Sequence, residues 1–162
     1  MEEKKKLWGF ETKQVVYAAI GAALYAVLAI ATNMLQLPGA GNVSIRPAVA
    51  IPMFFGVAFG PIVGFITGFV GNILADLLSG YGFWLWWDLG NGLLGLIPGL
   101  IYPTIESFRA SKSIWKAEIF VVLGALVGMG VASLSEMWVS GADINTVIFA
   151  KLLAAFISES IN

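Results

Sequence analysis

The sequence predicts an all-helical integral membrane protein, a bundle of six transmembrane helices in one domain over residues 1–162. Three observations support this class. The chain is 59% hydrophobic and only 12% charged, whereas soluble domains are about half apolar and a quarter charged. Its mean hydropathy is +0.87. Its nineteen glycines suit membrane helices, where small residues let backbones pack closely. A soluble fold of this length could not bury so much apolar surface.

The expected helices follow one another along the chain. The first runs from about 15 to 34, which at about 1.5 Å per residue matches a hydrocarbon core of roughly 30 Å. A turn-rich loop over 35–46 leads to a short second helix, which starts at Pro47 and ends before Gly60. The other four are expected at 61–78, 83–103, 114–134 and from about 144, the sixth being incomplete at residue 162.

The distribution of basic residues predicts the orientation of the bundle. Seven of the nine lie in the N-terminal stretch or after the fourth helix: Lys4, Lys5, Lys6, Lys13, Arg109, Lys112 and Lys116. The loops expected on the opposite side, 35–46, 79–82 and 135–143, contain a single basic residue, Arg46. Since cytoplasmic loops are enriched in Lys and Arg, both termini are expected in the cytoplasm, with 1–13 a basic cytoplasmic segment and 35–46 an external loop.

The absence of two residue types limits the reactions and metal sites that the chain could support. The chain has no cysteine and no histidine, which excludes thiol nucleophiles and nearly all zinc or haem ligation. No Gly-x-x-x-x-Gly-Lys-Ser/Thr phosphate loop occurs either, so ATP hydrolysis by that route is excluded. We therefore expect no metal, no cofactor and no enzymatic activity.

Polar side chains inside apolar helices are the strongest functional signal. Ionisable groups are costly in a bilayer and commonly mark solute or ion sites. Asn72 and Asp76 are one helical turn apart, and Asp88 and Asn91 share a face of the fourth helix. Both pairs flank the same outer loop, which predicts a substrate-binding site there.

The segment between these pairs is rich in aromatic residues. Trp84 and Trp87 belong to the stretch Tyr81-Gly82-Phe83-Trp84-Leu85-Trp86-Trp87. One interpretation is an interfacial aromatic belt, and the other is that some rings stack on a flat ligand whose polar edge meets Asp88 or Asn91. Arg46 and Asn42 of the external loop complete the predicted site, although Arg46 could instead meet lipid headgroups.

Small residues recur at four-residue spacing and permit close helix contacts. The glycine rows are expected to pack within the bundle: Gly60, Gly64 and Gly68, then Gly95 and Gly99, then Gly124 and Gly128. The row Ala18, Ala22 and Ala26 lies on the first helix, which has a lipid-facing side available for a partner.

Several of these segments together resemble the S components of energy-coupling factor (ECF) vitamin transporters. They are Ser44-Ile45-Arg46-Pro47-Ala48, Phe59-Gly60-Pro61-x-x-Gly64-x-x-x-Gly68, Asp76-Leu77-Leu78, Gly92-x-x-Gly95-x-x-x-Gly99 after the tryptophans, and the alanine row. Each motif alone is weak, and their order along nearly the whole chain carries the resemblance. Family members continue through a complete sixth helix, whereas this sequence stops within it.

The resemblance implies a multi-pass protein of a prokaryotic cell membrane that captures a vitamin or related micronutrient. It implies as partners a transmembrane coupling subunit and two ATPase subunits, with Ala18, Ala22 and Ala26 contacting the coupling subunit. The aromatic and polar residues suit riboflavin, thiamine precursors, pyridoxine, a queuosine precursor or a cobalamin, without choosing among them. The alternatives are a proton-coupled secondary transporter of a small aromatic solute, a membrane enzyme and an assembly scaffold.

Overall fold

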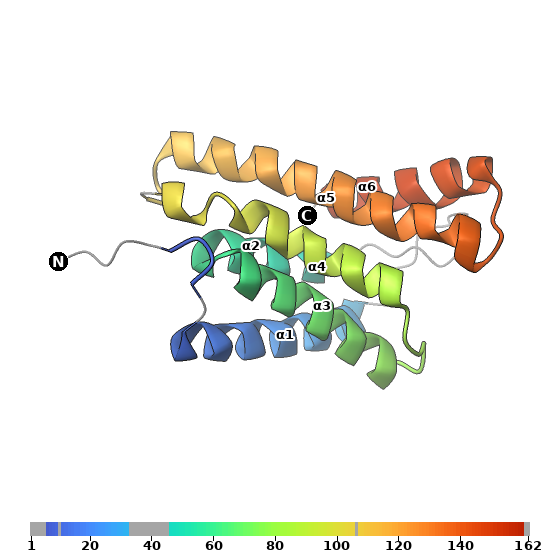
Figure 1. Ribbon diagram of the computed structural model, residues 1–162, viewed down its shortest axis with the longest axis horizontal. Coiled ribbons are helices and arrows are strands. Elements are labelled where there is room, and N and C mark those ends of the chain that lie inside the picture. Colours follow the sequence, from blue (N-terminus) through green and yellow to red (C-terminus); the bar gives the residue numbers. More distant parts are fainter. Residues whose placement is uncertain (1–5, 10, 33–45, 106, 161–162) are drawn as a thin grey trace.

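The computed structural model describes residues 6–9, 11–32, 46–105 and 107–160, with the side chains of 158–160 excepted (Figure 1). Within these ranges the chain is helical and contains no strand, which confirms the all-α prediction. The elements are α1 (Thr12–Thr32), the 3₁₀ turn η1 (Pro47–Val49), α2 (Ala50–Phe59), α3 (Pro61–Leu78), α4 (Leu85–Gly99), the 3₁₀ turn η2 (Tyr102–Thr104), α5 (Ser111–Val139), the π-helical η3 (Thr146–Leu152) and α6 (Leu153–Ser160).

Three of these helices, α1, α3 and α5, are long and apolar enough to cross a membrane. The short second helix is confirmed, and it is extended at its start by η1. The prediction of a continuous helix over 83–103 was wrong, because α4 has 15 residues, about 22 Å of helix. Pro98 near its end and Pro103 in η2 account for the early stop, since each proline removes a backbone donor.

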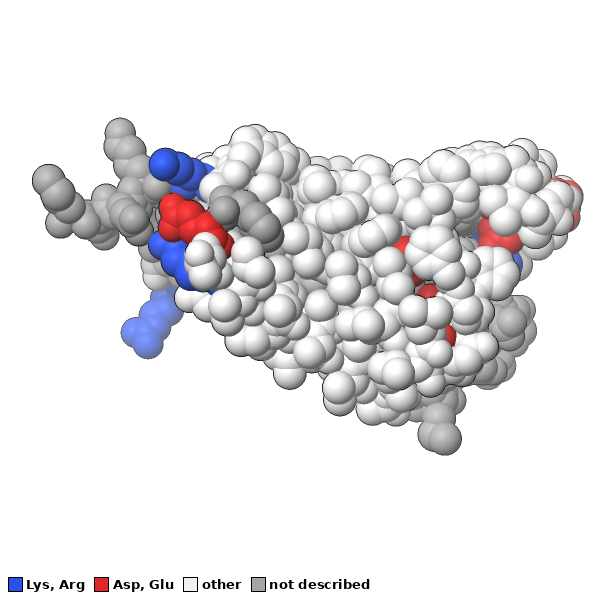
Figure 2. All heavy atoms as spheres, turned by 60° about the horizontal axis from the view of Figure 1, so that its bottom comes forward, with Lys and Arg blue, Asp and Glu red and all other residues white. Residues whose placement is uncertain are grey.

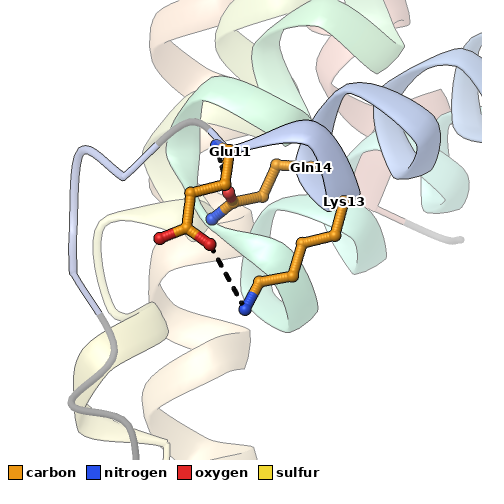
Figure 3. A network of polar contacts seen from close by, with 3 residues as sticks. All are labelled: Glu11, Lys13 and Gln14. Carbon is orange, nitrogen blue, oxygen red and sulfur yellow. Dashed lines mark hydrogen bonds and ion pairs between the residues drawn. The ribbon is translucent and has the colours of Figure 1, made fainter.

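The start of α1 is stabilised by its own side chains (Figure 3). The amide oxygen of Gln14 accepts a hydrogen bond from the backbone N–H of Glu11. This is one half of a capping box, in which the third helical residue reaches back to the N-cap. Lys13 lies 3.5 Å from the Glu11 carboxylate across an exposed surface, where ion pairs contribute little.

The final helical stretch is also capped by a side chain. The carboxylate of Asp143 accepts hydrogen bonds from the backbone N–H groups of Asn145 and Thr146 and from the Thr146 hydroxyl. These bonds satisfy N–H groups that have no partner within the first turn. They also hold the pKa of Asp143 below its ordinary value of 3.8, because they stabilise the ionised carboxylate.

Helix α4 occupies the middle of the bundle, with α3 and α5 on either side of it (Figure 1). Glycines bring these backbones together. A Cβ added at Gly95 would collide with the carbonyl of Gly64 in α3, and one added at Gly90 would collide with that of Gly128 in α5. The expectation that these glycine rows pack within the bundle is confirmed, since no side chain separates the backbones.

The surface has the polarity of a membrane protein. Charged side chains gather toward the two ends of the molecule, and a belt without charges lies between them (Figure 2). Large apolar side chains remain exposed along α1 and α5, including Val16, Ile20, Val27, Ile119 and Leu126. Exposed apolar area on this scale is unusual for a soluble monomer and is expected where lipid is the solvent.

Candidate functional site

A buried polar cluster lies at the end of the bundle where α3 stops and α4 begins. Asn72 is its centre, at 1% exposure. Its side-chain nitrogen donates to Asp76 Oδ2 over 2.9 Å and to Asp88 Oδ1 over 2.8 Å. The amide thus joins two carboxylates from neighbouring helices, and the predicted meeting of the two polar pairs is observed in the structure.

The chemistry of its neighbours fixes the orientation of the Asn72 amide. Ionised carboxylates only accept hydrogen bonds, so the nitrogen must face Asp76 and Asp88. The oxygen is then turned toward two donors, the Tyr25 hydroxyl at 3.1 Å and Arg46 Nη1 at 3.4 Å. Both polar atoms of the Asn72 side chain therefore form hydrogen bonds.

Tyr25 connects the cluster to α1. Its hydroxyl lies 2.8 Å from the amide oxygen of Asn91, and the Asn91 nitrogen donates to the backbone oxygen of Trp87. The tyrosine is fully buried and packs with Ala26 and Leu94 in the main apolar core. Tyr25 was not among the predicted site residues, although it follows Ala18 and Ala22 on one helical face, a spacing that indicates a shared buried position.

One atom of the cluster lacks a partner. Asp88 is fully buried, and within the part of the chain that the structure describes its Oδ2 forms no hydrogen bond. Asp76 is 8% exposed and interacts electrostatically with both Arg46 and Asp88. The described cluster therefore holds two carboxylates and one guanidinium, and it can accept a further hydrogen-bond donor.

The two predicted tryptophans lie in different environments. Trp87 is half-buried, and its indole N–H donates to Glu136 of α5 over 2.9 Å. Trp84 is 47% exposed, and its N–H donates to the backbone oxygen of Tyr81. Trp87 adjoins the cluster, whereas Trp84 lies toward the surface, as an interfacial aromatic residue would. Glu136 was not among the predicted site residues, because a single carboxylate near a helix end carries little signal.

The alanine row requires a correction. Ala18, Ala22 and Ala26 are 2%, 3% and 4% exposed, so they lie inside the bundle and not on a free face. Helix α1 packs against α3 through this row, and a Cβ added at Gly71 of α3 would approach the Ala22 carbonyl oxygen to 3.0 Å. In this arrangement the row cannot contact a second protein. Asn42, the remaining predicted site residue, lies outside the described residues.

Metal ligation finds little support in this set of side chains. Among the described residues, no three His, Cys, Asp or Glu side chains come together. The cluster instead offers two carboxylates, two amides, a phenol and a guanidinium. That composition is suited to hydrogen-bond recognition of a small polar molecule.

The apolar belt, the spanning helices and the buried polar cluster at one end define a multi-pass helical membrane protein. The family model for the ECF-type riboflavin transporter, S component, matches residues 9–162. The chain belongs to this family, which confirms the resemblance found in the sequence. It is therefore a substrate-binding component of a cell-membrane transporter and not an enzyme.

Curated relatives are identical to the chain at nearly two fifths of the aligned positions. A UPF0397 protein of Aliivibrio salmonicida is 39% identical over 146 residues, covering 86% of this chain and 78% of the relative. A UPF0397 protein of Photobacterium profundum is 36% identical over 155 residues, covering 92% and 78%. No solved structure matches the chain significantly.

Proposed function

We propose that this protein is the S component of an ATP-driven ECF importer and that it binds a vitamin or related micronutrient in the polar cluster between α3 and α4. The observation that carries the proposal is this cluster itself, in a chain that belongs to the S-component family. Buried polar groups in membrane helices face solute pathways far more often than lipid. Riboflavin, the solute in the family's name, is the first compound to test.

In this proposal the cluster faces the outer side of the membrane. It lies at the bundle end opposite the basic segments around Lys13 and Lys112, and basic segments favour the cytoplasm. Asn72, Asp76, Asp88, Asn91 and Arg46 form its polar wall. Trp87 supplies an aromatic surface beside that wall, and Asn42 of the external loop is a further contact.

The partners are a transmembrane coupling subunit and two ATPases, because the chain has no phosphate loop of its own. We propose that the coupling subunit docks on the outward face of α1. Ala19 and Ala23 are exposed there at four-residue spacing, beside Ile20 and Val27. Small residues allow a partner helix to approach closely, as required for association in lipid.

Uptake into proteoliposomes tests the proposal. The purified chain is reconstituted with and without the coupling subunit and ATPases, and riboflavin uptake is measured with ATP or with a proton gradient. We expect uptake only with the full complex and ATP. Uptake by the chain alone would refute the proposal.

One observation favours a second candidate, the proton-coupled transporter. Asp76 and Asp88 are two carboxylates held by the same amide inside the bundle, and carboxylates within membrane helices mark proton pathways in many transporters. Uptake that follows the proton gradient and disappears in Asp76→Asn would select this candidate.

A further inference from the structure

We infer that the cluster binds its solute through a positively charged or amino-bearing edge and rejects solutes that present a carboxylate or phosphate there. The inference rests on the proposed function, because it assigns a substrate class to the same site. It follows from hydrogen-bond accounting, from charge and from the position of the unpaired atom.

Asp88 has one carboxylate oxygen that forms no hydrogen bond with the described residues. Its Oδ2 is buried and has no partner among the described residues, while its Oδ1 accepts from Asn72. A buried polar atom without a partner destabilises the protein, and more so when it is charged. Such an atom in a binding protein is accounted for if the ligand supplies the missing donor.

The neighbouring donors are directed elsewhere. Asn72 directs its nitrogen to Asp76 and to the other oxygen of Asp88. The Asn91 nitrogen donates to the Trp87 backbone, and the Tyr25 hydroxyl faces the amide oxygens of Asn72 and Asn91. The arrangement thus holds Asp88 in place through its first oxygen, and none of these donors pairs with its second oxygen.

Charge points in the same direction. Asp76 and Asp88 interact electrostatically with each other, and Arg46 interacts with Asp76. One guanidinium for two carboxylates leaves this end of α3 and α4 short of positive charge. In a weakly polar interior an added cation is attracted and an added anion repelled more strongly than in water. An ammonium or amidine-like edge satisfies both the unpaired oxygen and the charge.

A series of probes that differ in one group tests the inference. Pyridoxamine, pyridoxine and 4-pyridoxate share a pyridine ring and carry an ammonium, a hydroxyl and a carboxylate at the same position. Their binding to the purified full chain in detergent is measured by calorimetry, with riboflavin in parallel. We expect pyridoxamine to bind about tenfold more tightly than pyridoxine, a difference of about 1.4 kcal/mol, since a hydrogen bond to a charged group is stronger than a neutral one. 4-Pyridoxate should not bind.

Substitutions then assign the preference to Asp88. In Asp88→Asn the pyridoxamine preference should disappear, because the amide keeps the shape and removes the charge. Glu118→Gln, the same chemical change at an exposed position in the first half of α5, should leave the preference intact. Thermal unfolding checks that each variant is folded, and Asp76→Asn, which should reduce the preference, replaces Asp88→Asn if the latter does not fold.

Other outcomes overturn the inference. Equal binding of pyridoxamine and 4-pyridoxate would do so, as would a preference that survives in Asp88→Asn. Binding of riboflavin alone, unchanged in Asp88→Asn, would refute the inference while the proposed function stands. If no probe binds, the inference also fails, and ATP-dependent uptake then decides the proposed function separately.

Discussion

At the scale of single residues, the Tyr25 hydroxyl joins three helices of the bundle. Replacing Tyr25 by Phe keeps the ring in its apolar surroundings and removes only the donor to Asn72 and Asn91. Hydrogen bonds between membrane helices contribute about 0.6 kcal/mol on average and at most about 1.7 kcal/mol. We therefore expect Tyr25→Phe to lower the free energy of unfolding by about 1 kcal/mol, measured by SDS titration in mixed micelles.

Tyr17→Phe is the matched control on the same helix. Tyr17 is 36% exposed, and its ring stacks on Phe59 with 4.3 Å between centroids. The substitution keeps this contact, so stability should change by less than about 0.5 kcal/mol. Equal losses in both variants would mean that the buried hydroxyl contributes nothing specific.

The two tryptophans should differ in their effect on solute binding. Trp87→Phe removes the hydrogen bond to Glu136 beside the polar cluster, while Trp84→Phe changes a ring that is turned toward the surface. We expect Trp87→Phe to weaken binding of the solute several-fold and Trp84→Phe to leave it unchanged. Calorimetric titration of both variants checks this, and the reverse order of effects would move the binding site toward the surface.

The sequence identifies most of the cluster, because amides and carboxylates are conspicuous in apolar helices. Asn72, Asp76, Asp88 and Asn91 are all found by this criterion. Tyr25 is not, since a tyrosine in an apolar run resembles any other core residue until its hydroxyl is placed. The alanine row is assigned to the wrong face for a related reason. A second small-residue row, Ala19 and Ala23, begins one residue later on the first helix, and only packing decides which row is buried.

At the scale of elements, the contact between α3 and α4 depends on the absence of side chains. A methyl group at Gly95 would meet the Gly64 carbonyl and force the helices apart. Gly95→Ala should therefore cost about 1–3 kcal/mol, the usual range for overpacking. Thermal unfolding in detergent measures the loss.

Gly130→Ala provides the control for this prediction. A Cβ at Gly130 of α5 has no neighbour within 4 Å, so the substitution removes only the flexibility of glycine. We expect a neutral or slightly stabilising effect, because alanine favours helix by about 1 kcal/mol. Similar destabilisation by both substitutions would refute the close-packing explanation.

The helix cap at Asp143 predicts a dependence on pH. Its folded pKa is lowered, so the stabilisation is present above the ordinary value of 3.8 and is lost as pH falls below it through the folded pKa. We expect the Asn145 and Thr146 amides to be protected from hydrogen exchange at neutral pH and to lose protection in acid, after correction for intrinsic exchange. Asp143→Asn should remove this pH dependence, and persistence of the dependence would assign it to another group.

The lengths of the elements were harder to predict than their number. The sequence has six apolar segments, and the described residues form helices in all six. The fourth segment was predicted to be one continuous span because its composition stays apolar to residue 103, but prolines end α4 at Gly99. Conversely, α5 runs from Ser111 to Val139 and is longer at both ends than the predicted 114–134, because polar residues at a membrane surface do not oppose helix formation.

At the scale of the whole molecule, the two alanine rows of α1 separate folding from partner docking. Ala23 is exposed and Ala22 is buried against α3. Ala23→Leu should therefore leave solute binding intact and abolish capture by the coupling subunit, since only docking needs close approach on that face. Co-purification with the coupling subunit measures capture, and calorimetry measures binding.

Ala22→Leu should behave differently, because the larger side chain has no room inside the bundle. It is expected to lower thermal stability, and to lower solute binding with it. If Ala23→Leu were instead the destabilising variant and Ala22→Leu the one that blocks capture, the buried row would be the docking surface after all.

The glycine contacts on both sides of α4 also bear on how the molecule can move. Helices separated by side chains can slide past one another as the side chains change rotamer. Backbones in direct contact have no side chains between them that could adjust in this way. Helices α3, α4 and α5 should therefore move together as one rigid unit. Entry and exit of a solute should therefore depend on the elements at its margin, above all η3 and α6, where no glycine among the described residues brings the backbones into contact.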